Sequence, residues 1–131
     1  MKFMLLMHYG GDADCGPAIH TWPPQDIQAH IQFMMRLNER LKAAGELVDA
    51  QGLAGPDQAR IVRARKGGPP AISDGPFPET KEFLAGFWIV DCASQARALE
   101  IAATASAAPG LGGVPMSIPI EVRQVMSPPP A

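Results

Sequence analysis

The spacing of hydrophobic positions changes several times along the chain, and each change marks the boundary of a predicted element. Residues 2–8 form a nearly continuous apolar run, which is typical of a strand covered on both faces. From Pro24 to Gly45, apolar residues recur at steps of three and four, which predicts an amphipathic helix between them. The buried stripe of that helix comprises Ile27, His30, Met34, Leu37 and Leu41, widened by Ile31 and Met35.

The segment after this helix has the pattern of a β-hairpin. Residues 46–53 and 58–65 are short β-type runs, and Gly55-Pro56-Asp57 between them is a turn combination. We therefore expect these two runs to pair with each other. The glycines and prolines of residues 66–70 are expected to end the second strand.

The second half of the chain predicts a strand, a helix and a final strand. Residues 83–91 are apolar on both alternating faces, which indicates a central strand. Ser94 is a suitable N-cap for an alanine-rich helix that continues to about Ala107. Residues 118–123 predict the last strand, and Pro119 favours an edge or strand-start position there.

This order predicts an α+β fold with a ferredoxin-like βαββαβ sheet and both helices on one face. We expect residues 1–126 to form a single domain, residues 9–23 a long loop within it, and residues 127–131 a disordered proline-rich tail. The second face of such a sheet would expose a large apolar patch. A homodimer that buries this face is the simplest solution.

Composition narrows the possible environments. The 131 residues carry a formal net charge of -2, which argues against direct nucleic-acid binding. No apolar run approaches the length of a membrane span, and the N-terminal run is too short for a signal peptide, so we expect a cytoplasmic protein. Cys15 and Cys92 are too few for a disulfide framework, and Cys92 is expected to pack beside the central strand.

One string carries a family resemblance. Asp74-Gly75-Pro76-Phe77-Pro78-Glu79-Thr80-Lys81-Glu82, followed by Gly86-Phe87, resembles the DGPF signature of the YCII-related family. Residues 1–7, 41–45 and 121–123 support the resemblance. The resemblance implies a dimeric α+β barrel, in which two ferredoxin-like sheets pack face to face, with a pocket in each subunit. The loop from Gly11 to Pro24 and the segment from Pro109 to Pro119 look longer than in relatives.

Asp74 is the first candidate for chemistry. A carboxylate in a pocket can accept a proton, but a carboxylate at a turn also commonly binds its own backbone. Gly75 would allow a positive φ, Pro76 would stiffen the turn, and Phe77 would anchor it in the core. The string is therefore also explained by structure.

His30 is the second candidate, because an imidazole in the apolar stripe of a helix needs a hydrogen-bond partner. The resemblance implies a helix histidine paired with an aspartate, and Asp49 is a possible partner. A core histidine with one satisfied hydrogen bond is the competing interpretation.

Other residues are candidates for substrate contacts. His8 and Tyr9 end the first strand, where pocket residues gather, although a solvent-facing strand end is equally compatible. The candidate substrate-binding set is completed by Asp49, Phe77 and Lys81, with Glu79 and Glu82 nearby. Charges beside a turn are also typical of a solvated surface. Asp12, Asp14, Cys15 and His20 are ligand-type residues, but their spacing matches no metal motif. We predict neither a metal nor a cofactor.

Two functions follow. The first is a dimeric small-molecule-binding protein with acid/base activity, using His30 and Asp74 for proton abstraction or elimination. The second is a non-catalytic regulatory or interaction protein, because DGPF-type proteins resemble products associated with alternative sigma factors. Whether the protein is an enzyme stays open at this stage.

Overall fold

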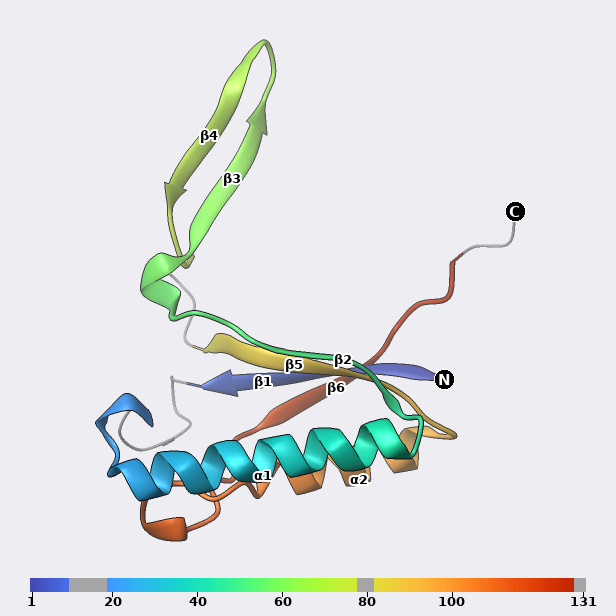
Figure 1. Cartoon of the computed structure of the whole chain (residues 1–131). Helices are drawn as coiled ribbons and strands as arrows, with labels where there is room; N and C mark the ends of the chain where they lie inside the picture. The colour runs from blue at the N-terminus through green and yellow to red at the C-terminus, as the bar shows by residue number, and fades with distance from the viewer. Residues whose placement is uncertain (10–18, 78–81, 129–131) are drawn as a thin grey trace.

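The structure is a computed structural model that describes residues 1–9, 19–77 and 82–128. Four strands form one antiparallel sheet in the order β2-β5-β1-β6, with two helices on one of its faces (Figure 1). A hairpin of two further strands projects from the opposite side (Figure 1). The elements are β1 (Lys2–Tyr9), α1 (Pro24–Ala43), β2 (Leu47–Gly52), β3 (Arg60–Arg65), β4 (Gly68–Asp74), β5 (Phe83–Asp91), α2 (Gln95–Ser106) and β6 (Ile120–Gln124), with short 3-10 turns η1 (Ile19–Thr21), η2 (Pro56–Gln58) and η3 (Leu111–Gly113).

The four-stranded sheet confirms the predicted ferredoxin-like arrangement with both helices on one face. The hydrophobic core lies between that face and the helices, because alternate residues of the two central strands point toward α1 and α2. Phe3 and Leu5 of β1 and Trp88 and Val90 of β5 are buried there. Leu37 and Leu41 of α1, Ala98, Ile101, Ala102 and Ala105 of α2, and Cys92 complete the cluster.

The ends of α1 follow the predicted signals. Pro24 opens the helix, and Gly45 follows it with φ of 73°. The amide of Glu46 donates to Leu41 O at 2.8 Å and the amide of Gly45 donates to Lys42 O at 3.1 Å, which is the Schellman pattern that satisfies the last carbonyls. The chain then turns directly into β2.

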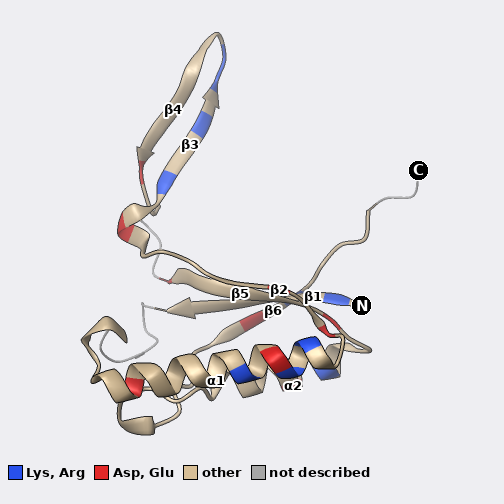
Figure 2. Cartoon of the chain, viewed as in Figure 1, with Lys and Arg blue, Asp and Glu red and all other residues tan. Residues whose placement is uncertain are grey.

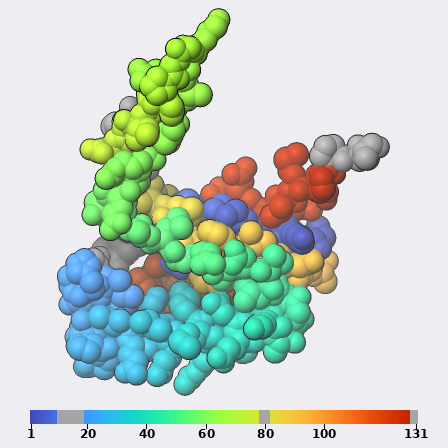
Figure 3. Space-filling model, turned by 45° about the horizontal axis from the view of Figure 1, so that its top comes forward, coloured from blue at the N-terminus to red at the C-terminus, as the bar shows by residue number. Residues whose placement is uncertain are grey.

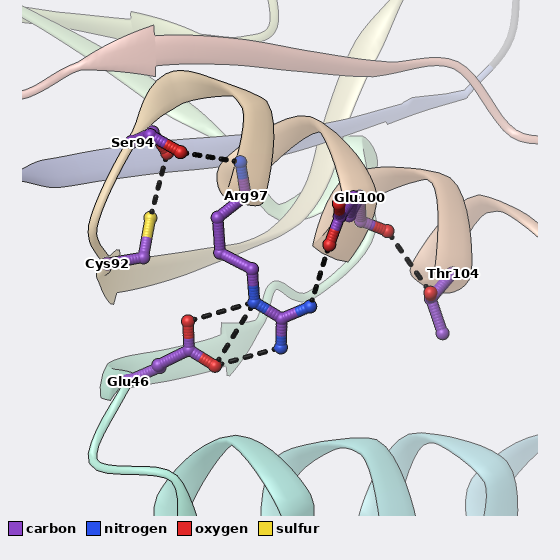
Figure 4. Close-up of polar contacts among 6 residues, drawn as sticks. All are labelled: Glu46, Cys92, Ser94, Arg97, Glu100 and Thr104. Atoms are coloured by element: carbon purple, nitrogen blue, oxygen red, sulfur yellow. Dashed lines mark hydrogen bonds and ion pairs between the residues drawn. The ribbon is translucent and has the colours of Figure 1, made fainter.

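Helix α2 is capped and tied to the start of β2. Ser94 Oγ accepts a hydrogen bond from the Arg97 amide at 3.2 Å, which confirms the predicted N-cap. The Arg97 guanidinium donates to both carboxylate oxygens of Glu46 and also to Glu100 (Figure 4). The hydrogen bond from Arg97 lowers the pKa of Glu46 below its ordinary value, although partial burial opposes the shift.

The predicted pairing of residues 46–53 with residues 58–65 is wrong. β2 pairs with β5, whereas β3 pairs with β4, which includes the Pro69-Pro70 segment expected to end the strand. Gly67, with φ of 75°, allows the tight turn between β3 and β4. The two prolines are compatible with β4 because the ladder shifts register beside them, between Arg63 and Arg65, and because the outer edge of a two-stranded ribbon needs no N–H.

The hairpin differs from the body in shape and charge. It projects away from the sheet as a thin ribbon in the ribbon and space-filling views (Figures 1 and 3). Residues 60–74 contain Arg60, Arg63, Arg65 and Lys66 against Asp74, so the hairpin is basic while the whole chain is acidic (Figure 2). Val62 and Ile72 face each other across the two strands and are 60% and 66% exposed.

The sheet face opposite the helices stays uncovered by the described part of the chain (Figure 1). Its central positions are apolar, because Met4 pairs with Ile89 and Leu6 pairs with Phe87. His8 and Glu121 lie on the same face, with His8 Nε2 and Glu121 Oε1 3.2 Å apart. None of the helices in the described ranges has the length and hydropathy of a membrane span.

Two predicted segments fall partly outside the described residues. Of the predicted loop 9–23, Tyr9 belongs to β1 and residues 19–21 form η1, while residues 10–18 are not described. The predicted tail, residues 127–131, follows β6, which ends at Gln124. Residues 129–131 of this tail are not described. A disordered tail at 127–131 stays a prediction.

Candidate functional site

A cavity of about 840 Å³ lies between α1 and one end of the sheet. It exists because the helix-facing side of the sheet has small residues at this end. Ala50 and Gly52 of β2 and Gly86 of β5 occupy positions in line with the buried Trp88. Side chains this small leave the space under α1 unfilled, and its volume is typical of small-molecule sites.

The two glycines of the cavity floor are not equivalent. A Cβ atom on Gly86 would lie 2.7 Å from Gln51 O, so the backbones of β2 and β5 approach each other too closely for a side chain. A Cβ atom on Gly52, the cross-strand partner of Gly86, would meet nothing within 4 Å. Gly86 is therefore required by packing, whereas Gly52 leaves open space.

His30 lines one end of the cavity, and its tautomer is determined by its partner. His30 Nδ1 lies 3.0 Å from Pro109 O. A carbonyl oxygen only accepts hydrogen bonds, so Nδ1 carries the proton in the neutral ring. Nε2 is then left with a lone pair, and it is the nitrogen available to a bound molecule. Trp22 packs edge-on against the ring, with 5.9 Å between ring centroids.

The segment that supplies the Pro109 carbonyl is held in place by several hydrogen bonds. Asp26 Oδ2 accepts from the Gly112 amide at 3.0 Å, which joins this segment to the first turn of α1. The Ser106 hydroxyl donates to Ile118 O at 2.6 Å, and the Met116 amide donates to Ala108 O at 2.9 Å. Met116 and Ile118 also line the cavity. The long Pro109–Pro119 connection therefore builds one wall of the site.

Asn38 and Trp88 form a second polar point at the cavity wall. Trp88 Nε1 donates to Asn38 Oδ1 at 2.9 Å, and Trp88 itself is buried. An indole nitrogen can only donate, which assigns Oδ1 rather than Nδ2 to this contact. The Asn38 amide nitrogen, with two donor hydrogens, is left for other partners.

Several sequence candidates meet at this cavity. Tyr9, His20 and His30 all line it, together with Asp57 from η2. Tyr9 packs against Phe83, with ring centroids 6.0 Å apart. None of the described lining residues is a lysine or an arginine.

Other candidates lie elsewhere. Asp74 ends β4, its side chain is 91% exposed, and its Oδ1 lies 3.5 Å from Arg60 Nε. Asp49 accepts hydrogen bonds from the Ala50 amide and from Gln51, so the His30 partner is the Pro109 carbonyl and not Asp49. His8 pairs with Glu121 on the open face of the sheet. Lys81, like Glu79, lies outside the described residues.

The conformation of residues Asp74–Phe77 differs from the turn that their residue types predicted. Gly75 does not have a positive φ; a Cβ atom there would lie 3.1 Å from the Ala59 Cβ, so the glycine serves close packing instead. The bond between Gly75 and Pro76 is cis. Phe77 is 54% exposed and does not anchor the turn in the core.

The cavity residues that were not predicted from the sequence include Trp22, Asn38, Gly52 and Gly86. Asn38 could have been predicted from the helical period. It lies about two turns after His30, so both side chains share the sheet-facing side of α1. Gly52 and Gly86 had no such signal, since an unfilled position is visible only when the strands are aligned.

The metal-type residues do not define a site in the described structure. Asp12, Asp14 and Cys15 lie outside the described residues, whereas His20 belongs to η1 and lines the cavity. Within residues 1–9, 19–77 and 82–128, no group of three or more His, Cys, Asp or Glu side chains is placed to hold a metal ion. Cys92 is a free, buried thiol in the core cluster, as predicted.

The fold and the cavity define a small ferredoxin-like α+β protein with a pocket between sheet and helix. The profile of the YCII-related domain family matches residues 1–115, and the chain belongs to this family. It is also similar to the uncharacterized protein R00369 of Rhizobium meliloti (strain 1021), with 32% identity over 82 residues. That match covers 63% of this chain and 65% of the relative's length.

Proposed function

We propose that this protein binds a small molecule in the cavity beneath α1 and uses His30 as an acid/base group, without a cofactor. The observation that carries the proposal is the 3.0 Å contact from His30 Nδ1 to Pro109 O. It fixes a ring whose Nε2 lone pair is available to a ligand in a largely apolar cavity.

The proposed chemistry is proton abstraction or elimination. In this proposal, His30 Nε2 takes a proton from the bound molecule, and the Pro109 carbonyl stabilises the imidazolium through the hydrogen bond at Nδ1. The walls contributed by Trp22, Met34 and Trp88 would exclude water from the reacting group. Tyr9 would contact the ligand from the end of β1.

A thermal-shift screen with small aromatic and carbonyl-containing metabolites tests binding. At a ligand concentration near 100 times Kd, wild-type protein should gain about 2.7 kcal/mol of stability. His30→Ala should lose this gain. For ligands with an acidic C–H group, exchange of that hydrogen in deuterated water, followed by NMR, then tests proton transfer.

Two variants serve as controls for the screen. Gly52→Leu should block binding by filling the cavity without the backbone collision expected at Gly86. Asp74→Asn should leave cavity binding unchanged, because Asp74 lies on the exposed hairpin. A catalytic role for Asp74 stays a prediction, and loss of proton exchange in Asp74→Asn with binding intact would support it. The proposal fails if no ligand stabilises the wild type or if His30→Ala binds equally well.

We also propose that the open sheet face is the contact surface of a homodimer. Met4, Leu6, Phe87 and Ile89 give this face an apolar centre that a monomer would leave in water. Analytical ultracentrifugation tests this, with Phe87→Lys expected to shift the protein toward monomer. A monomeric wild type at micromolar concentration would contradict it.

A non-catalytic interaction role is the second candidate, and the hairpin favours it. The hairpin combines basic side chains with the exposed Val62 and Ile72, which suits contact with an acidic protein partner. A protein that binds no small molecule but loses a partner when residues 60–74 are removed would support this role.

A further inference from the structure

We propose that the cavity selects an elongated, flat, neutral ligand that is a conjugated hydroxyaryl ketone, read at its hydroxyl end by His30 and at its carbonyl end by Asn38. This inference rests on the proposed function and specifies the ligand class for the same cavity. It assigns Asn38, together with Trp88, as the determinant of ligand specificity.

The donor at the Asn38 end follows from the Trp88 contact. Trp88 Nε1, 2.9 Å from Asn38 Oδ1, can only donate, so the side-chain amide is held with Oδ1 toward the indole. Asn38 lines the cavity and is half-buried, and its Nδ2 hydrogens are available there. The preferred ligand group at this end is therefore a hydrogen-bond acceptor.

The acceptor at the His30 end follows from the Pro109 contact. With Nδ1–H donated to Pro109 O, Nε2 accepts a hydrogen bond from the ligand. The two ends of the cavity thus require opposite groups, a donor from the ligand at His30 and an acceptor from the ligand at Asn38.

Helix geometry sets the length of the ligand. His30 and Asn38 lie eight residues apart on α1, which corresponds to about 12 Å along the axis. Met34 lies midway between them on the same side of the helix, and it also lines the cavity. Trp22 stands beside His30 and Trp88 beside Asn38, so apolar and aromatic surface connects the two polar ends.

The charge of the lining favours a neutral carbonyl over a carboxylate. Among the described lining residues there is no lysine or arginine, and Asp57 is acidic. A carboxylate would lose its hydration without a lysine or arginine partner, whereas a ketone oxygen needs only the Asn38 hydrogen bond.

Conjugation would couple the two ends during proton transfer. The ligand O–H bond breaks, an N–H bond forms at His30 Nε2, and the electron pair left on the ligand oxygen delocalises through the ring system to the carbonyl oxygen. Asn38 Nδ2–H donates to that oxygen as its negative charge grows. The reverse transfer restores both partners.

The test uses three biphenyl probes and isothermal titration calorimetry on the full chain. The full probe carries a hydroxyl at one para position and an acetyl group at the other, so its oxygen atoms lie about two helix turns apart. The second probe lacks the acetyl group, and the third carries an aminomethyl group in its place. Wild-type protein should bind the full probe about tenfold or more tightly than either of the others.

Asn38→Asp should reverse this preference. Oδ1 of the aspartate can still accept the hydrogen bond from Trp88. Its second oxygen, an acceptor, takes the place of the Asn38 Nδ2 donor, so the aminomethyl probe should become the tightest ligand. Asn38→Leu provides a second variant if Asn38→Asp does not fold. It should bind the full probe about tenfold more weakly than wild type and leave binding of the acetyl-free probe unchanged.

The outcomes separate this inference from the proposed function. If wild type binds all three probes equally and His30→Ala binds none, the ligand class is overturned while the His30 site stands. If no probe binds, the ligand class is also overturned, and the broader metabolite screen decides the proposed function. Unchanged preferences in both Asn38 variants would remove Asn38 from the site.

Discussion

The two faces of the four-stranded sheet use similar side chains for different purposes. On the helix-covered face, Leu5 and Val90 are completely buried and Trp88 is nearly so. On the open face, Leu6, Phe87 and Ile89 are only half-buried. A hydrophobic residue in these strands is therefore buried by the helices on the first face. On the second face it stays partly exposed and can contact a partner. The cavity lies on the covered face, where the small residues interrupt the packing.

A pair of adjacent leucines gives the largest expected difference between the faces. Leu5→Ala should lower the free energy of unfolding by about 2–5 kcal/mol, because it opens a cavity in a packed core. Leu6→Ala should cost about 1 kcal/mol or less in dilute protein, since Leu6 keeps part of its surface in solvent and its loss leaves no enclosed cavity. Urea unfolding of both variants measures the difference. Equal losses at every protein concentration would contradict an open face in the monomer.

The two cavity glycines give the next effect. Gly86→Ala should destabilise the protein by about 1–3 kcal/mol, because the new Cβ collides with the Gln51 carbonyl. Gly52→Ala, on the paired strand, should be neutral or slightly stabilising, because it meets open space and restricts the unfolded chain. Thermal denaturation distinguishes them, and equal Tm values would show that β2 and β5 separate easily.

The contact between β2 and α2 gives a smaller, pH-dependent effect. The pKa of Glu46 is lowered in the folded protein, mainly by the hydrogen bond from Arg97, so its stabilisation is present above the unfolded pKa and is lost as pH falls through the folded pKa. Glu46→Gln should therefore cost about 1 kcal/mol near pH 7, since Arg97 is partly exposed, and almost nothing at the acid end. Urea unfolding at several pH values measures this. A pH-independent cost would attribute the effect to packing.

Removal of the hairpin should have the smallest effect on the body. The Gly75 amide donates to Ala59 O at 2.9 Å, so the two ends of the hairpin are already adjacent. Residues 60–74 can therefore be replaced by an Asn-Gly turn. The free energy of unfolding of the monomer should change by about 0.5 kcal/mol or less. A larger loss, measured by urea unfolding, would show that the hairpin packs on the sheet.

The elements of the fold that could be predicted depend on residues close together in the sequence. The helical period of α1, the Ser94 cap and the two apolar faces of β5 are each encoded within a few neighbouring residues, and all three are confirmed. The buried stripe of α1 is narrower than predicted, because Ile31 and Met35 are 49% and 56% exposed. Strand pairing is not local. Within the predicted run 58–65, residues 60–65 pair with residues that follow them, because the Lys66-Gly67 turn outweighs the two prolines that suggested a break.

The site was harder to predict, because much of it consists of backbone and empty space. His30 and Tyr9 were identified as polar residues near apolar elements, and both line the cavity. The partner of His30 is a carbonyl oxygen of Pro109, which has no side-chain signature. The volume of the cavity depends on Gly52 and Gly86, whose effect appears only when β2 and β5 are in register.

The two prolines of β4 have a consequence for the behaviour of the protein in concentrated solution. A projecting two-stranded ribbon has unpaired edges, which are templates for intermolecular β-sheet aggregation. Pro69 and Pro70 have no N–H to offer at the edge of β4, and the arginines of β3 repel a second copy of the same strand. The hairpin is thus protected against strand addition. The proline-bearing edge of β4 therefore offers a binding partner side chains and not a continuous row of N–H donors.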